Sequence, residues 1–533
     1  MRVLSIKMDK RIGKKEIREI LAKRFEADRC KKLSDIPSPS LFKDMKKATS
    51  RIVEAIQKKQ KIVIVGDYDA DGVISSVILS EFFDDNHIEY ELIIPNRFRD
   101  GYGVSADIVN RVDADIIITV DNGISAVEAG EVCEKKGIDL IITDHHTVPD
   151  TTPKAYAVVN PKQSDCAFPN SEICGAVVAW YLVASLKEEL KLEYNLGKFL
   201  DILAIAIIAD MMPLNDINRI IVKSGLKKIN SSNRAFLQAV KDYYRKDSFL
   251  SEDISYLLAP LINSAGRLED ATLAYELIKE RDLNEAYLKL EYIASLNNER
   301  KEIESDLLKK AIKSVEKDQK IVIVWGDDWH EGVIGIVAAK LSRKFKVPSI
   351  VFSITDGVAK GSARSIGEID ILKHVSKCSS LLLGFGGHKG AAGMSLEEKN
   401  LEDFKRAMQD SLKEEDEENF KEKKKVLGVL DADEVDLELL DILEYFEPYG
   451  QENPRPRFVI KDAYVKGHKL LGRDKNHQKI LISSKNGTVD TIDFNFEKKV
   501  SFAQNITFTC TVSKNSFRGI VSPQLVVDEL ILD

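Results

Sequence analysis

Aspartate side chains are concentrated in the segment GDYDADG, where Asp67, Asp69 and Asp71 occur within five positions. This segment directly follows the apolar residues 62–65, and a short apolar run bounded in this way predicts a buried strand. Carboxylates this close together repel one another unless a cation, protons or water offset their charge. Such a density of hard oxygen ligands indicates Mg²⁺ or Mn²⁺. The simpler alternative is a solvated turn whose aspartates cap a helix that begins near Val73.

Two other apolar runs also end in polar side chains. One is followed by the DNG sequence of Asp121, and the other by the DHH sequence of Asp144, His145 and His146. Runs rich in Ile and Val alternate here with helical segments of about a dozen residues, which predicts a parallel sheet covered on both faces. Ligands of such sheets bind beyond the carboxyl ends of the strands. Each polar segment alone is explained by a turn or a surface histidine, but together they predict a metal site.

The next part of the chain is predicted to be mainly helical. Residues 200–212 form an apolar helix near whose end Asp210 lies, and a buried carboxylate costs several kcal/mol unless it is paired or metal-bound. The alternative is that Asp210 lies at a solvent-exposed helix end before Pro213. Residues 261–268 are expected to form a turn that carries Arg267.

A second α/β unit is predicted from Lys320 onward. It contains two segments of small residues, both expected to be loops: residues 361–365 with one arginine, and residues 383–393 with a histidine and a lysine. Glycine-rich loops let backbone amides and a cation approach phosphate closely. The alternative is a tight turn between packed elements.

The last unit, from Val426, is predicted to be a small β-barrel, because five short strands follow one another in it. An OB-fold is the leading candidate. Its basic and aromatic residues are expected to form either a surface on which the bases of a single strand stack or a solvated basic face. They are Lys461, Lys466, Lys469, Arg473, Lys475, Lys479, Arg518, Tyr464, Phe494 and Phe517.

Composition restricts the class of protein. A chain of 533 residues is expected to form several domains, and a net charge of −8 with 31% charged residues excludes a general polycation but not a local basic groove. The six cysteines contain no CxxC pair, which indicates reduced thiols of a cytoplasmic protein. The N-terminus has no apolar signal core, and no apolar run is long enough to span a bilayer. We therefore expect no membrane association.

The chain closely resembles the DHH phosphoesterase superfamily in a set of motifs. These are GDYDADG (66–72), NRFRDGYG (96–103), VDNG (120–123), TDHH (143–146), Asp210 followed by MMPL, and INSAGR (262–267). WHEGVIGI (329–336), GSARS (361–365) and GGHKGAAG (386–393) are similar to the DHH-associated domain. The stretch EPYGQENPRPRF (447–458) and the β-rich tail resemble the OB-fold of the RecJ single-strand exonucleases, which usually carry Gly at the position of Glu452. That difference places the local turn in doubt, but not the chemistry.

The resemblance implies an α/β multidomain fold. Its expected parts are a charged N-terminal segment (1–44), a DHH catalytic domain with a helical part (45–280), a connecting helix (281–318), a DHH-associated domain (319–415) and an OB-fold-like domain (426–533).

The implied activity is 5′-to-3′ hydrolysis of single-stranded DNA to mononucleotides in repair and recombination, with two Mn²⁺ or Mg²⁺ ions. Two cations about 3.5–4 Å apart can activate a water and stabilise both oxygens of an in-line phosphoryl displacement. The resemblance also implies a helicase and a single-strand binding protein as partners, and we expect a monomer.

The resemblance further implies roles for individual residues. The implied metal ligands are Asp69, Asp71, Asp121, His145 and Asp210. Asp67 and His146 would be further ligands or supports of the ions, Asp144 and His146 would be catalytic, and Asp144 would orient the imidazoles beside it. Asp71 or Asp121 would bridge the ions. The implied phosphate-binding residues are Arg97, Arg267, Ser362, Arg364, Gly387 and His388.

Two alternatives remain open from the sequence. A nanoRNase, cyclic-dinucleotide phosphodiesterase or pyrophosphatase of the same superfamily would be shorter and would lack the C-terminal barrel. A non-catalytic scaffold would have lost metal ligands, whereas every ligand position is filled here.

Overall fold

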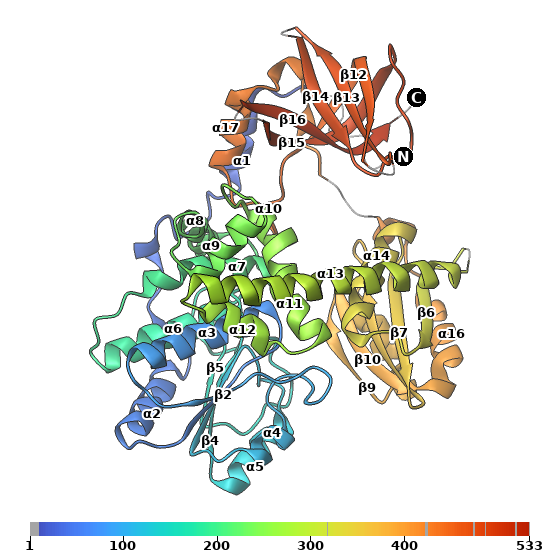
Figure 1. Ribbon diagram of the computed structural model, residues 1–533. Coiled ribbons are helices and arrows are strands. Elements are labelled where there is room, and N and C mark those ends of the chain that lie inside the picture. Colours follow the sequence, from blue (N-terminus) through green and yellow to red (C-terminus); the bar gives the residue numbers. More distant parts are fainter. Residues whose placement is uncertain are drawn as a thin grey trace.

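The computed structural model describes residues 10–316, 318–421, 425–472, 475–485, 487–517 and 520–531. Figure 1 shows three bodies. The largest is an α/β body with additional helices, the second is a smaller α/β body, and the third is a β-barrel. A long helix, α13 (Leu283–Lys313), runs from the first body to the second, as the sequence predicted for this part of the chain.

The first sheet has the strand order β2-β1-β3-β4-β5, and all neighbouring strands are parallel. The parallel sheet expected from the sequence is therefore present. Side chains alternate along each strand, so Ile62 and Ile64 of β1 pack with α2, α3 and α6, whereas Val63 and Val65 pack with α4 and α5. The strand order reverses between β1 and β3, and ligands of such sheets bind at this point, outside the carboxyl ends.

The elements of this layer have the following bounds: α2 (Met45–Gln57), β1 (Ile62–Val65), α3 (Ala70–Asp85), β2 (Glu91–Ile93), α4 (Ala106–Arg111), β3 (Ile116–Val120), α5 (Val127–Lys136), β4 (Asp139–Thr143) and β5 (Ala157–Val159). The helices that follow are α6 (Gly175–Glu189), α7 (Leu200–Ala209), α8 (Asp216–Asn230), α9 (Ala235–Tyr243), α10 (Ser251–Asp253), α11 (Ala259–Leu268) and α12 (Thr272–Lys279).

Residues 261–268 are helical, so the expected turn was wrong. They form most of α11, whose Leu261, Ile262 and Ala265 are buried in the core. Gly266 is explained by close packing: a Cβ atom there would lie 2.4 Å from the backbone oxygen of Tyr68. The glycine lets the helix contact the loop after β1.

The second body has a mixed sheet of order β6-β7-β8-β10-β9, in which only the pair β6–β7 is parallel. The loop expected at residues 361–365 was wrong, because residues 361–364 lie in β8. Residues 383–393 contain the β9–β10 hairpin, so only Lys389 and Gly390 form a turn there, as in the alternative of a tight turn between packed elements. The small residues serve sheet packing, since a Cβ atom at Gly361 would lie 2.2 Å from the ring of Phe352. The bounds are β6 (Val322–Asp327), α14 (Glu331–Phe345), β7 (Ser349–Thr355), β8 (Val358–Arg364), α15 (Ile371–Lys377), β9 (Gly384–His388), β10 (Ala391–Glu397) and α16 (Leu401–Ser411).

The third body is a closed barrel of OB type, as predicted. Its strands pair in the order β12-β13-β14-β16-β15, and β15 pairs back with β12. The bounds are β11 (Gly428–Val429), α17 (Leu437–Tyr445), β12 (Arg457–Leu471), β13 (His477–Ser484), β14 (Gly487–Asp493), β15 (Asn505–Phe517) and β16 (Ile520–Ile531). Glu452 has a φ of 60°, a left-handed conformation that glycine adopts more easily.

The N-terminal segment, for which the sequence indicated no role, packs on this barrel. Helix α1 (Lys14–Lys23) lies beside α17 in Figure 1, and its Ile17 and Leu21 are fully buried in the core of the barrel body. The amide of Ile12 donates a hydrogen bond to the carbonyl oxygen of Val429. We therefore propose that residues 10–25 belong to the barrel body.

Among the described residues, no helix combines the length and the apolar character needed to cross a membrane.

Candidate metal centre

The three aspartates after β1 occupy different places. Asp69 caps α3, because its Oδ1 accepts hydrogen bonds from the amides of Asp71 (3.0 Å) and Gly72 (3.1 Å). Helix capping was the alternative to metal binding for these aspartates. It uses only Oδ1 of Asp69. Asp67 is 1% exposed, and its Oδ2 has no hydrogen-bond partner.

Asp71 is held by the start of α6. Its two carboxylate oxygens accept hydrogen bonds from the amides of Gly175 (2.6 Å) and Ala176 (2.9 Å). The positive end of a helix dipole favours a carboxylate there. A Cβ atom at position 175 would lie 2.3 Å from Oδ1 of Asp121, so glycine is needed for the helix to approach both aspartates.

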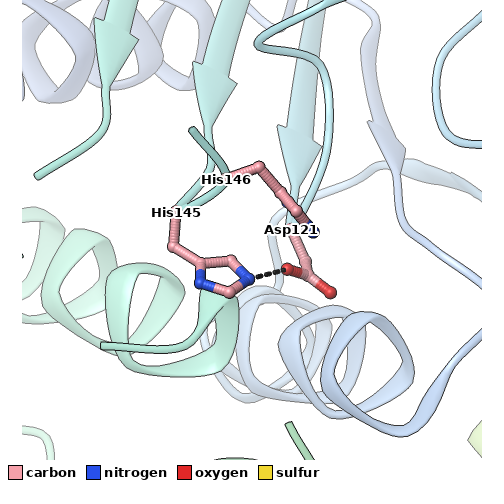
Figure 2. Close-up of side chains that lie close together, drawn as sticks. All are labelled: Asp121, His145 and His146. Atoms are coloured by element: carbon pink, nitrogen blue, oxygen red, sulfur yellow. Dashed lines mark ion pairs between the residues drawn. The ribbon is translucent and has the colours of Figure 1, made fainter. Parts of the chain in front are cut away.

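Asp121 and His145 meet in front of the neighbouring strand ends. Figure 2 shows Asp121 after β3 and the two histidines after β4, with the His145 ring directed at the Asp121 carboxylate. Nε2 of His145 lies 3.2 Å from Oδ1 of Asp121, 3.6 Å from Oδ2 of Asp210 and 3.7 Å from Oδ2 of Asp71. One imidazole nitrogen therefore faces carboxylates from three separate parts of the chain.

Asp144 supports His146. Its Oδ1 lies 2.7 Å from Nδ1 of His146 and accepts the amides of both histidines, and its Oδ2 accepts the amide of Ile124. Burial lowers the pKa of His146, but the hydrogen bond to Asp144, together with the negative charges of Asp144, Asp210 and Asp69, outweighs burial and raises this pKa to about 9. Asp144 thus orients the ring of His146, whereas no hydrogen bond joins it to the ring of His145.

Buried negative charge dominates the electrostatics of the cluster. Burial, followed by repulsion from Asp71 and Asp69, raises the pKa of Asp210 to about 9. Burial and repulsion from the same two residues raise the pKa of Asp121 well above its ordinary value, and burial does the same for Asp67. In the absence of a cation, the cluster therefore retains protons that carboxyl groups normally lose.

The donor set fits divalent cations. Three groups of side chains have ligand atoms within 4.8 Å of one another: Asp121 with His145 and His146, Asp71 with His145 and Asp210, and Asp67 with Asp69 and Asp121. Buried atoms without a hydrogen-bond partner include Oδ1 of Asp121 and Oδ2 of Asp210. Unpaired oxygens and an imidazole at one place are the ligand types of Mg²⁺ and Mn²⁺ sites. The structure thus brings together all the predicted ligands, with Asp67 and His146 among them.

Two asparagines that sequence reasoning missed fix this geometry. Asn122 is fully buried, and its Nδ2 donates to the carbonyl oxygens of Val65, Gly66 and Val120, which joins the ends of β1 and β3. Asn263 accepts the amide of Ala70 (2.8 Å) and so anchors the start of α3 to α11. Their only sequence signal is their position inside the DNG and INSAGR motifs.

Arginines gather beside the cluster, between the first and second bodies. Nη1 of Arg267 donates to the carbonyl oxygen of Gly332 (3.1 Å), and Nε of Arg97 donates to that of Gly266 (3.2 Å). Burial, with repulsion from Arg97, Arg300 and Arg364, lowers the pKa of Arg267 to about 10. Arg300, which the sequence analysis missed, lies on α13.

The remaining predicted phosphate-binding residues lie on the second sheet. Ser362 accepts a hydrogen bond from Nη1 of Arg364 (3.0 Å). Gly387 and His388 are exposed at the end of β9. Burial and the charges of Arg364 and Lys162 lower the pKa of His388, which places its ring near these cations.

The expected basic surface of the barrel is described only in part. Arg473, Arg518 and the side chain of Phe517 lie outside the described residues. Tyr464 and Phe494 are 44% and 57% exposed. Lys479 is paired with Asp490 at 2.6 Å, so it is not an unpaired cation.

Each of the three bodies contains a segment that matches a known family model. Residues 61–207 match the family model described as the N-terminal domain of the DHH family, residues 318–414 match the DHHA1 domain, and residues 428–529 match the RecJ OB domain. The single-stranded-DNA-specific exonuclease RecJ of Haemophilus influenzae is 32% identical over 93% of this chain and 92% of its own length.

The chain belongs to the RecJ family. RecJ of Bacillus subtilis is 34% identical over 93% of this chain, which spans only 64% of the length of that relative. RecJ of Escherichia coli is 31% identical over 91% of this chain and 90% of its own length.

Solved RecJ structures have the same fold. The crystal structure of RecJ from Thermus thermophilus in complex with Mn²⁺ matches with a TM-score of 0.82 at 25% identity, over 99% of this chain and 80% of that chain. An exonuclease RecJ bound to manganese matches with a TM-score of 0.61 at 30% identity, over 70% of this chain and 95% of that chain.

Proposed function

We propose that the protein is a metal-dependent exonuclease that hydrolyses single-stranded DNA from 5′ to 3′ into mononucleotides, in DNA repair and recombination. One observation carries the proposal: a RecJ-family chain brings its full predicted set of carboxylate and imidazole ligands together at the switch point of the first sheet. The names of its relatives support single-stranded DNA as the substrate.

Asp69, Asp71, Asp121, His145 and Asp210 would hold two Mn²⁺ or Mg²⁺ ions, with Asp67 as a further ligand. Both ions occur in RecJ structures from Thermus thermophilus. When bound, such ions activate a water and stabilise the charge that develops on the phosphate oxygens.

Two further groups of the chain would act beside the ligands. His146 is positioned by Asp144, and its side chain is 46% exposed, so its ring can meet a substrate phosphate. Its Nε2 lies 3.3 Å from the hydroxyl oxygen of Tyr102, which fixes the side of the ring opposite Asp144.

The arginines would bind the phosphates of the strand. Arg97, Arg267 and Arg364 form no ion pair with any described carboxylate, so their charge is available to an anion. A guanidinium recognises phosphate through its planar set of donors. Their position between the cluster and the second body would hold the 5′ phosphate next to the site of cleavage, with Ser362, Gly387 and His388 on the other wall.

We further propose that the protein is a cytoplasmic monomer that acts with a helicase and a single-strand binding protein. The six cysteines are free, and five of them are buried, which agrees with a reducing compartment. The partners rest on the family resemblance.

A substrate panel tests the proposal against other activities of the superfamily. A long single strand, a duplex of the same sequence, dinucleotides and pyrophosphate are incubated with the protein and Mn²⁺. We expect mononucleotides from the long single strand and little product from the duplex. Activity confined to dinucleotides or pyrophosphate would overturn the proposal, and a complete absence of turnover with no Mn²⁺ bound would favour a scaffold.

A further inference from the structure

A cavity separate from the metal centre lies where the N-terminal segment, α8 and α17 meet. Its volume is about 420 Å³, near the lower end of the ~300–1,000 Å³ range of small-molecule sites. Arg18 and Ala22 of α1, Arg219 and Lys223 of α8, and Tyr445 of α17 contribute to its wall. The cavity therefore lies between the first body and the barrel body.

The cavity has an excess of positive charge. Arg18, Lys31, Arg219 and Lys223 line it, whereas Asp28 is its only lining carboxylate. None of the four basic side chains forms an ion pair with a described residue. Two of the four, Arg219 and Lys223, are half-buried, and Asp28 offsets part of the charge of Arg219. Partly buried cations that outnumber the nearby anions are costly, so the arrangement favours binding of a negatively charged group.

Among these cations, Lys223 is the best candidate for binding an anion. It is half-buried and forms no hydrogen bond or ion pair with a described residue; its Nζ lies 5.3 Å from the centre of the Tyr445 ring. Burial, followed by repulsion from Arg219 and Lys227, lowers its pKa. Arg219 beside it stacks on Phe25, with 3.6 Å between the guanidinium carbon and the ring centre, and donates only to the carbonyl oxygen of Glu447 (3.3 Å).

Aromatic rings form another part of the wall. Phe25 and Phe446 are stacked with ring centres 6.4 Å apart, and Tyr445 packs edge-on against Phe446 at 5.1 Å. Tyr445 is 63% exposed, so one side of its ring is open to a ligand. An open aromatic face beside unpaired cations suits a planar group that carries a phosphate.

We propose that this cavity binds a mononucleotide, with the phosphate on Lys223 and Arg219 and the base on the ring of Tyr445. The proposal goes beyond the nuclease function and does not depend on it, because none of the lining residues belongs to the metal centre. A bound nucleotide would contact α8, which begins six residues after Asp210, and α17 of the barrel body. It would therefore hold the two bodies in one arrangement.

The test is calorimetric titration of the full-length protein, in EDTA, with deoxyadenosine monophosphate, inorganic phosphate and deoxyadenosine. EDTA removes metal ions that would hold a phosphate at the metal centre. The arginines beside that centre are also proposed to bind phosphate, so the titration is analysed for two sites, and the site that Lys223→Gln weakens should prefer the monophosphate over both fragments. Lys223→Gln should weaken binding of the monophosphate roughly tenfold or more, since it removes a charge-assisted contact. Tyr445→Ala should weaken it to a similar degree, about tenfold, and leave inorganic phosphate unaffected.

Lys228→Gln is the matched control, because Lys228 is a lysine of the same helix that does not line the cavity and is not among the charges that shift the pKa of Lys223. It should bind the monophosphate as the wild type does. Thermal melts confirm that each variant is folded, and Lys223 has no hydrogen bond or ion pair with a described residue to lose. Absence of monophosphate binding by the wild type, or unchanged binding by both Lys223→Gln and Tyr445→Ala, would overturn the proposal. Equal affinity for phosphate and monophosphate would overturn the role of the base.

Discussion

Nε2 of His145 lies 3.2 Å from Oδ1 of Asp121, an oxygen that has no hydrogen-bond partner among the described residues. The two side chains come from the ends of adjacent parallel strands, and Asp71 and Asp210 reach the same imidazole nitrogen from other elements. Nitrogen and oxygen atoms that face one another in this way are expected of side chains that share a cation.

Asp121→Asn should remove metal binding and cleavage together, while the metal-free fold becomes more stable. The amide replaces a buried carboxyl group that the neighbouring carboxylates repel. Loss of partners that merely support a metal ligand costs about 10–100-fold in activity or affinity, so loss of a ligand should cost at least about 100-fold. Thermal melts with EDTA and with Mn²⁺, together with cleavage rates, check this. Asp150→Asn, at an exposed aspartate, is the control. Normal turnover by the Asp121→Asn variant would contradict the site.

The metal-free protein should lose stability as the pH rises from about 4 to about 9. Burial and the neighbouring carboxylates raise the pKa of Asp210 to about 9 and that of Asp121 well above its ordinary value. Each group holds its proton more tightly in the folded state, so its contribution is complete below the unfolded-state pKa of about 4 and is lost as the pH rises through the folded-state pKa.

Because a divalent cation relieves the same repulsion, Mg²⁺ should raise the melting temperature more at pH 8 than at pH 5. Melting curves of the wild type from pH 5 to 9, with EDTA or Mg²⁺, measure this, and Asp121→Asn should show a flatter profile in EDTA. A shift by Mg²⁺ that is the same at every pH would count against the raised pKa values.

Tyr102→Phe should slow cleavage and leave metal binding unchanged. The hydroxyl lies 3.3 Å from Nε2 of His146 and donates to the backbone oxygen of Asp121 (3.4 Å), but it belongs to none of the ligand groups found among the described residues. Loss of a hydrogen bond to a charged group is worth about 1.5–3 kcal/mol, or roughly 10–100-fold in rate. Single-turnover rates and Mn²⁺ titration separate the two effects, with Phe98→Leu as a control at an exposed aromatic of the same loop. Wild-type rates for Tyr102→Phe would show that the contact is not used.

Leu21→Ala should destabilise the barrel body. Leu21 is fully buried among residues of α17 and the barrel, and a cavity of this kind costs about 2–5 kcal/mol. We expect weaker binding of long single strands but an unchanged stabilisation by Mg²⁺, which reports on the first body. Lys15→Ala, at an exposed position of α1, is the control. If Leu21→Ala behaved as Lys15→Ala does, the N-terminal helix would not be part of the barrel body.

The sequence predicted the ligand side chains because metal chemistry restricts residue type and because strand ends in a parallel sheet share one edge. Asp69 also caps a helix, so the two interpretations of the first motif are both correct for that residue. The sequence could not reveal why Gly266 and Gly175 are required, since each is set by contact with a distant part of the chain.

Small residues misled the prediction of local structure. In GSARS, Gly361 leaves room for the ring of Phe352, and in GGHKGAAG, Gly387 has a φ of 148° and lets β9 lie close to the backbone of Ala391. The role of α1 was hidden for a related reason: Ile12, Ile17 and Leu21 enter a core, with Ile20 and Phe25 packed against it, and that core belongs to α17 and to strands more than 400 residues away.

Cleavage polarity tests the central claim most directly. A long single strand labelled at its 5′ end or at its 3′ end is digested with Mn²⁺, with Mg²⁺ and with EDTA, and early products are separated by size. We predict that the 5′ label appears at once as a mononucleotide and the 3′ label only in progressively shorter strands, with no product in EDTA. Release of the 3′ label first, internal cuts, or full activity in EDTA would contradict a metal-dependent 5′-to-3′ exonuclease.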